Sequence, residues 1–159
     1  MKYLLLAVLL MLPGLPAFAQ GDLQAERASL RGISSFYVDV TVEGPKQLAA
    51  SESLVAATLI QRVEKHLAGA GLPVRPRVEG PHLHLHLNMM EVEGGLLPFS
   101  LNAHFYQPVR LERNREIIAA ATWDEGVVGL VSQDRIPLIL ESLNSLVDQF
   151  ASDFGTANR

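Results

Sequence analysis

The sequence predicts a two-layer α+β sandwich, with elements in the order β-α-β-β-β-α and both helices on one face of a mostly antiparallel sheet. Three observations favour this fold. Four segments alternate apolar and polar residues with a period of two, as half-buried strands do. Two longer segments repeat apolar residues at spacings of three and four, as amphipathic helices do. The last three strand segments are joined by two tight turns, which predicts an antiparallel meander.

Residues 1–19 have the pattern of a secretory signal peptide. A basic start at Lys2 precedes the apolar run 4–12, and Ala17-Phe18-Ala19 has the small-x-small spacing of a cleavage site. The run is shorter than the about 20 apolar residues that span a bilayer, and no later segment is a transmembrane candidate. We therefore expect an exported protein, periplasmic or secreted, with no transmembrane segment after cleavage.

The composition indicates one folded domain and excludes several classes of site and partner. The chain has 159 residues, of which 48% are hydrophobic and 19% charged, so we expect one folded domain over residues 33–155. Residues 20–32 are expected to form a mobile leader or one short helical turn. The chain has no cysteine, which excludes a lipidated cysteine, disulfides and cysteine–zinc sites. A net charge of −4 without a basic cluster argues against nucleic acid as a partner.

The first strand and the first helix follow the leader. In the strand, the apolar residues expected to point inward alternate with polar ones. These inward residues are Phe36, Val38, Val40 and Val42. Gly44-Pro45 ends this strand. The apolar stripe from about Gln47 to Ala68 predicts one helix. Gly69 and Gly71 are its expected stop, because glycine takes the left-handed cap conformation without a steric penalty.

The meander from His82 to Asp124 is the part of the chain with the clearest two-residue period. It opens with alternating histidine and leucine, and we expect the leucines to point inward: Leu83, Leu85 and Leu87. The next strand continues the inward set with Phe99, Leu101, Ala103, Phe105, Val109 and Leu111. The last strand contributes Ile117, Ala119, Ala121 and Trp123.

A strand register follows if Gly94 and Asn114 centre the two turns. It pairs Leu87 with Leu101, His84 with His104, Leu111 with Ile117, and His104 with Asp124. Within the middle strand, Pro108 would remove a ladder donor, so we expect a bulge or a sheet edge there.

The last helix is predicted over about Arg135 to Phe154. Residues 126–129 are expected to form the loop before it. Asp134 is a candidate N-cap, and Pro137 falls in the first turn, where its missing N–H costs little.

The register gives a candidate metal site on the polar face of the sheet. His84, His104 and Asp124 lie in one row across three strands, with His82 and His86 beside it. Two imidazoles and a carboxylate suit zinc, copper or nickel, and no other cofactor is expected. The alternative is that histidines on alternate positions simply face water or a partner.

Two further groups of polar residues need an explanation. Arg110, Arg113 and Arg115 cluster at the second turn, where they either protect a sheet edge or contact an anionic ligand or partner. A hydrolase would need a serine near His104 and Asp124. The serines lie in no nucleophile-elbow context, so we do not expect an enzyme.

Three motifs carry a resemblance that covers most of the mature chain. They are Leu30-Arg31-Gly32, Ala121-Thr122-Trp123 with Gly126-x-x-Gly129, and Val147-Asp148-Gln149-Phe150. Together they resemble a family of small exported bacterial proteins of unknown function, which implies no activity. The order of elements is also similar to the lipopolysaccharide-assembly lipoprotein and to the amino-terminal domain of the Tol translocation protein. Those modules bind other envelope proteins, but this chain lacks the lipidated cysteine of the former.

From the sequence we therefore expect a soluble exported binding or accessory module that presents a polar sheet face or edge to an envelope protein. The first alternative is a protein that binds a transition metal through the histidines of the sheet face. The second alternative is an envelope hydrolase.

Overall fold

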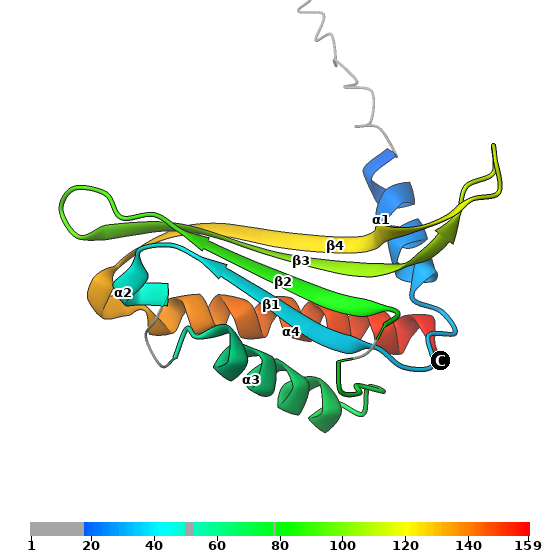
Figure 1. Cartoon of the computed structure of the whole chain (residues 1–159), viewed down its shortest axis with the longest axis horizontal. Helices are drawn as coiled ribbons and strands as arrows, with labels where there is room; N and C mark the ends of the chain where they lie inside the picture. Colours follow the sequence, from blue (N-terminus) through cyan, green and yellow to red (C-terminus); the bar gives the residue numbers. More distant parts are fainter. Residues whose placement is uncertain (1–17, 50–52, 78) are drawn as a thin grey trace, which may run out of the picture.

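The computed structural model describes residues 18–49, 53–77 and 79–159. A four-stranded sheet forms one layer, and the helices α3 and α4 form the other beneath it (Figure 1). The predicted α+β sandwich is confirmed. The predicted signal peptide lies outside the described residues except for its last two, Phe18 and Ala19, with which helix α1 begins.

The strands lie in the same order in the sheet as along the chain. They are β1 (Tyr37–Glu43), β2 (His82–Met89), β3 (Leu96–Arg110) and β4 (Ile117–Ser132). β1 and β2 are parallel, because the chain crosses over through a helix between them, and the other two pairs are antiparallel. The mostly antiparallel character of the sheet is therefore as predicted.

The helices differ in detail from the prediction. They are α1 (Phe18–Ser29), α2 (Lys46–Ala49), α3 (Ala56–Gly69), the 3-10 turn η1 (Gln133–Arg135) and α4 (Pro137–Ala157). The single helix expected over residues 47–68 is two helices, because Val55 has the extended backbone angles φ −59° and ψ 131°. The segment expected to be mobile or a single turn is the 12-residue helix α1.

The start of α4 also differs from the prediction. Asp134 lies in η1 and is not the N-cap; its Oδ1 accepts a hydrogen bond from Ser132 Oγ at 2.5 Å. Pro137 does lie at the start of α4, as predicted.

β4 extends well past the expected end of the last strand. Residues 126–129, expected to form a loop, pair with β3 from Phe99 to Asn102. Gly126 and Gly129 were interpreted as a loop, but Gly129 lies within β4, where it leaves room for a packed side chain. A Cβ atom at Gly129 would lie 2.4 Å from Phe99 Cε1, so the Phe99 ring fills the space that a side chain would take.

The strand register is confirmed over most of the meander. Leu87 pairs with Leu101, and His84 pairs with His104. His104 in turn pairs with Asp124. The expected pair Leu111 and Ile117 is wrong by one residue, because a bulge between Phe105 and Tyr106 shifts the register.

The bulge does not lie at Pro108, but the alternative of an edge holds there. β2 begins at His82, which pairs with Tyr106, so the part of β3 that contains Pro108 has only β4 beside it. The missing N–H of Pro108 therefore leaves no gap in the ladder with β2.

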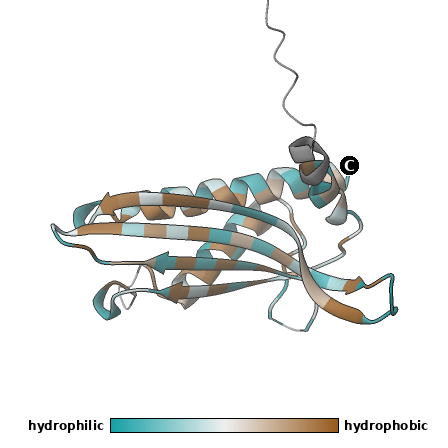
Figure 2. Ribbon diagram, turned by 90° about the horizontal axis from the view of Figure 1, so that it is seen from above, coloured by the Kyte–Doolittle hydropathy of each residue, from teal (hydrophilic) through white to brown (hydrophobic). Residues whose placement is uncertain are grey.

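The core lies between the sheet and the two long helices. The three leucines of β2 are 0–2% exposed, and Phe36, Phe105 and Phe150 meet at ring-centroid distances of 5.5–5.6 Å. Figure 2 shows the underlying alternation as successive hydrophilic and hydrophobic bands along the strands. Trp123 is buried as predicted, but the residues that were expected to continue its inward set are exposed: Ile117, Ala119, Ala121 and Leu111. They lie beyond the bulge, where the β3–β4 ribbon projects from the layer of helices (Figure 1).

α1 is tied to the sandwich by a buried carboxylate. Asp153 of α4 is 7% exposed and accepts hydrogen bonds from Arg27 Nε at 2.7 Å, Trp123 Nε1 at 3.1 Å and Gln149 Nε2 at 3.1 Å. Three donors compensate the burial of this charge. In the described ranges, no helix is both long and apolar enough to cross a membrane.

Candidate functional site

The candidate site is the face of the sheet that α3 and α4 leave uncovered, which we call the open face (Figure 1). Its side chains come from the alternate positions that do not enter the core, because successive residues of a strand point to opposite faces. The register aligns them in four rows across the sheet. The rows are Tyr37, His82, Tyr106; Asp39, His84, His104, Asp124; Thr41, His86, Asn102, Gly126; and Glu43, Asn88, Ser100, Val128.

The first row is a stack of three aromatic rings. The ring centroids of Tyr37 and His82 are 4.8 Å apart at an interplanar angle of 16°, and those of His82 and Tyr106 are 5.2 Å apart at 18°. His82 Nδ1 also lies 3.2 Å from Gly80 O. Because the ring faces contact one another, the stack offers ring edges and tyrosine hydroxyl groups to a partner, in fixed positions.

The second row begins with a chain of polar contacts. Arg77 Nη1 lies 3.1 Å from Asp39 Oδ1, and Asp39 Oδ2 lies 3.2 Å from His84 Nδ1. Burial lowers the pKa of His84 below its usual value. The hydrogen bond and the charge of Asp39 oppose this shift, and the neighbouring His82 and His86 add to it. The neutral imidazole is therefore favoured at His84.

The second row ends with His104 and Asp124, which are direct cross-strand neighbours. The row predicted from the sequence is thus present in the register. Among the described residues, however, no group of three or more histidine, aspartate or glutamate side chains is placed to hold a metal ion. A hydrolase would need a serine beside His104, but Ser100 of the same strand is four residues away, which is about 13 Å at about 3.3 Å per residue.

His86 in the third row has an incomplete set of partners. Its Nε2 atom lies 3.4 Å from Glu43 Oε2, but without the geometry of a hydrogen bond, and this atom is buried. A buried polar atom without a hydrogen bond costs free energy. His86 therefore keeps an uncompensated ring nitrogen beneath the side chain of Glu43.

An apolar end of the open face was missed from the sequence. Three apolar residues, Met90, Pro98 and Leu130, lie beside the fourth row. The Met90 N–H donates to Pro98 O, and Pro98 pairs with Leu130, so the three are aligned across the sheet. Met90 is 62% exposed, Leu130 59% and Val128 81%. Met90, Pro98 and Val128 border a surface hollow of about 300 Å³. The β-branched residues around Gly129 were the signal for a strand, but the two glycines favoured a loop.

The three arginines of the second turn lie apart from the rows. Arg110, Arg113 and Arg115 are all exposed, and Arg115 has a left-handed φ of 63° at the tip of the β3–β4 ribbon. The acidic Glu112 and Glu116 share this tip, so its net charge is small. Anion or partner contact by these arginines stays a prediction.

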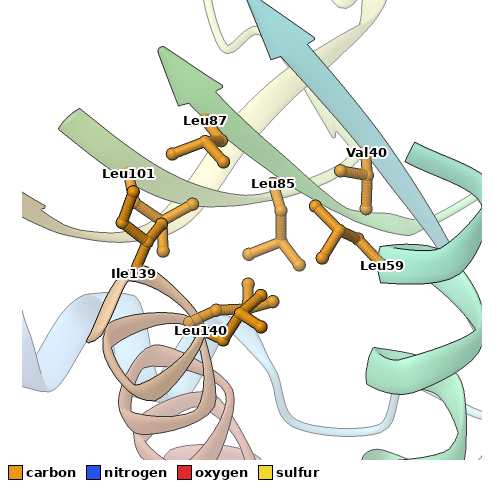
Figure 3. A pocket seen from close by; sticks show the side chains of 8 residues that line it. Val40, Leu59, Leu85, Leu87, Leu101, Ile139 and Leu140 are labelled. Carbon is orange, nitrogen blue, oxygen red and sulfur yellow. The ribbon is translucent and has the colours of Figure 1, made fainter. Parts of the chain in front are cut away.

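The void between the sheet and the helices is not a ligand site. It has a volume of about 10 Å³ and is lined only by apolar side chains, among them Leu59, Leu85 and Leu140, which point toward one another (Figure 3). A void of this size has room for at most one water, and it offers that water no polar partner.

No protein-family model and no curated protein matches the sequence. Among solved structures, the chain is similar to a minor lipoprotein from Acinetobacter baumannii, at 12% sequence identity over 77% of this chain and 87% of that chain. The TM-score is 0.29, which is too low to support a statement about fold or function.

Proposed function

We propose that this protein is an exported binding module that docks another protein of the cell envelope on its open face, and that it is not an enzyme. One observation carries the proposal: α3 and α4 cover one face of the sheet and leave the other to four ordered rows of side chains. A sheet face with fixed aromatic and polar groups and an apolar end has the composition of a protein interface.

The fixed positions of these side chains favour a docking surface over a surface that only contacts solvent. The stack of Tyr37, His82 and Tyr106 and the contacts of Asp39 hold side chains in single positions before any partner arrives. Preorganised groups lose less conformational entropy on binding, so each contact contributes more to affinity. The exposed apolar side chains at the other end of the face would add buried area.

Site-specific photo-crosslinking tests the proposal. A photoreactive phenylalanine analogue replaces Asn102 at the centre of the open face, and Gln61 on the exposed side of α3 serves as the control. In envelope extracts, the Asn102 site is expected to give one defined product, identified by mass spectrometry, that Gln61 does not give. Equal products from both sites, or none from Asn102, would refute docking on the open face.

Transition-metal binding is the second candidate, because His84, His104 and Asp124 do share a row. Rearrangement of these side chains would be needed before they could share an ion. Calorimetric titration of the untagged protein with zinc, copper and nickel tests it, beside a His84→Ala/His104→Ala variant. Tight binding at one site that is lost in the variant would establish this function; weak binding that the variant leaves unchanged would remove it.

A further inference from the structure

We infer that the outer edge of β4, from Asp124 to Val131, is an acceptor site for an extended segment of the partner, which adds to the sheet as a fifth strand. This inference rests on the proposed function and names the form that the partner presents. Main-chain hydrogen bonds give affinity in strand addition, and pockets for alternate side chains give specificity.

The direction of the main-chain groups of β4 follows from one hydrogen bond. Gln133 N donates to Gly95 O at 3.3 Å, one step past the pair of Leu96 and Ser132. Residues of an antiparallel strand alternate between bonding their partner strand and facing away from it. The odd-numbered residues from Trp123 to Val131 therefore bond β3, and the even-numbered residues direct their N–H and C=O groups outward.

The outward groups are available over a defined length. β4 is the last strand of the sheet. At its bulge, α1 occupies the edge, because Ser29 Oγ donates to Thr122 O at 3.0 Å. From Asp124 onward, the outward N–H of Gly126 donates to the neighbouring Glu125 Oε1 at 3.2 Å, and no other outward N–H bonds a residue that the structure describes. The eight residues that remain span about 26 Å, at about 3.3 Å per residue.

A hollow adjoins β4 on each face of the sheet. On the open face lies the hollow of about 300 Å³ beside Val128, Pro98 and Met90. On the helical face, a second hollow of about 310 Å³ lies between Val127 of β4 and Leu146 of α4. An added strand would project its side chains alternately to the two faces. On the helical face they would meet the hollow beside Val127, and on the open face they would pack against the exposed side chains of Val128 and Leu130.

The edge also lacks the usual protection against strand addition. Natural edge strands carry lysine, proline or inward-pointing charges that prevent pairing. From Gly126 to Val131, β4 has no charged residue and no proline, and Val128 and Leu130 are 81% and 59% exposed. An unprotected edge of this length is expected to have a partner.

The charged residues of β4 indicate whether the added strand comes from another protein or from a second copy of this chain. The charged residues of β4 are Asp124 and Glu125, and Asp124 has no ion pair with any residue that the structure describes. β4 contains no lysine or arginine, so the β4 strand of a second copy cannot supply the opposite charge. The segment that fits is foreign, with apolar residues at alternate positions and a lysine or arginine opposite the acidic end.

The test selects peptides from a random twelve-residue library displayed on phage, with residues 20–159 as the target. Enriched peptides are expected to alternate apolar residues and to carry lysine or arginine near one end. Replacing that cation by glutamate should weaken binding about two- to fivefold. On the nitrogen-15-labelled protein, the peptide should shift the amide signals of residues 124–131 and protect the Val128 and Leu130 amides from hydrogen exchange.

Matched variants complete the design. Val128→Lys/Leu130→Lys should weaken the selected peptide about tenfold or more, since both anchors are lost. Ile117→Lys/Ile118→Lys changes two exposed apolar residues of the same strand beyond α1 and should leave the affinity unchanged.

The outcomes separate this inference from the proposed function. Peptides that shift only His84 and His104 would overturn strand addition and leave docking on the open face intact. Absence of any enriched peptide that binds either place would contradict both. Self-association of the protein that Val128→Lys/Leu130→Lys abolishes would identify a second copy as the occupant and would overturn the inference.

Discussion

His84 Nδ1 lies 3.2 Å from Asp39 Oδ2, across the parallel pair of β1 and β2. The contact lies on the open face, and Arg77 approaches the other oxygen of the same carboxylate at 3.1 Å. It shows that the polar side chains of this face are positioned by the sheet register, and it makes His84 a measurable reporter of the face.

The first prediction concerns the pKa of His84. Burial lowers it, and Asp39 opposes the shift through a hydrogen bond and its charge. Asp39→Asn is therefore expected to lower the pKa of His84 further, as followed by NMR titration of the imidazole signals. Asp124→Asn, on the far side of the same row, should leave the pKa of His84 unchanged. A rise in this pKa in Asp39→Asn would contradict the assigned contact.

The second prediction concerns stability against pH. Because the pKa of His84 is lowered in the folded state, the unfolded state binds more protons at this residue near and below its usual pKa of about 6.5. The free energy of unfolding should therefore fall as the pH drops from about 7.5 through this range. In His84→Gln the fall should be smaller, as measured by urea unfolding at several pH values. Equal slopes for both proteins would show that His84 titrates alike in the two states.

The third prediction tests the packing of β4 against Phe99. Gly129→Ala places a Cβ atom 2.4 Å from Phe99 Cε1, so the ring must move and stability should fall by about 1–3 kcal/mol. Gly155→Ala is the control, because its new Cβ atom meets no heavy atom within 4 Å. It lies inside α4, where alanine should stabilise by about 0.5–1 kcal/mol. Urea unfolding of both variants measures these changes, and a neutral Gly129→Ala would show that the ring is free to yield.

The fourth prediction tests the buried carboxylate that joins α1 to the sandwich. Asp153→Ala leaves Trp123 Nε1 and Arg27 without their acceptor and should destabilise by about 3 kcal/mol. Asp148→Ala is the control on the same helix. It removes an exposed contact with His66 and should cost less than about 1 kcal/mol. Thermal or urea unfolding gives both changes in stability. Equal losses in the two variants would contradict a larger contribution from the buried Asp153 carboxylate.

The meander was predictable because its side chains alternate over most of the β2–β3 pair. From Leu83 to Leu87 and from Phe99 to Phe105 the inward residues are apolar and the outward ones polar, so the pattern fixes both the face and the register. The row of His84, His104 and Asp124 followed directly, because the hairpin turn sets which residues pair.

The errors have physical causes at particular residues. At the bulge, Thr122 is the extra residue that shifts the register, and no local pattern marks it. In β4, Gly129 indicated a loop, although its role is to make room for the Phe99 ring. Because this part of β4 was expected to be a loop, the apolar end of the open face was not predicted either. The contacts of Arg77 with Asp39 could not be predicted either, because they join segments far apart in the sequence.

The fifth prediction tests the central claim, that the open face is the docking surface. Thr41→Arg/Asn102→Arg places two large cations in the third row, and Thr58→Arg/Gln61→Arg makes the matched change on α3. The measurement is the affinity of the purified envelope protein identified by crosslinking. We predict that the open-face variant loses about 100-fold or more in affinity, while the α3 variant binds as the unmodified protein does. Unchanged affinity in the open-face variant, or a loss confined to the α3 variant, would contradict the account.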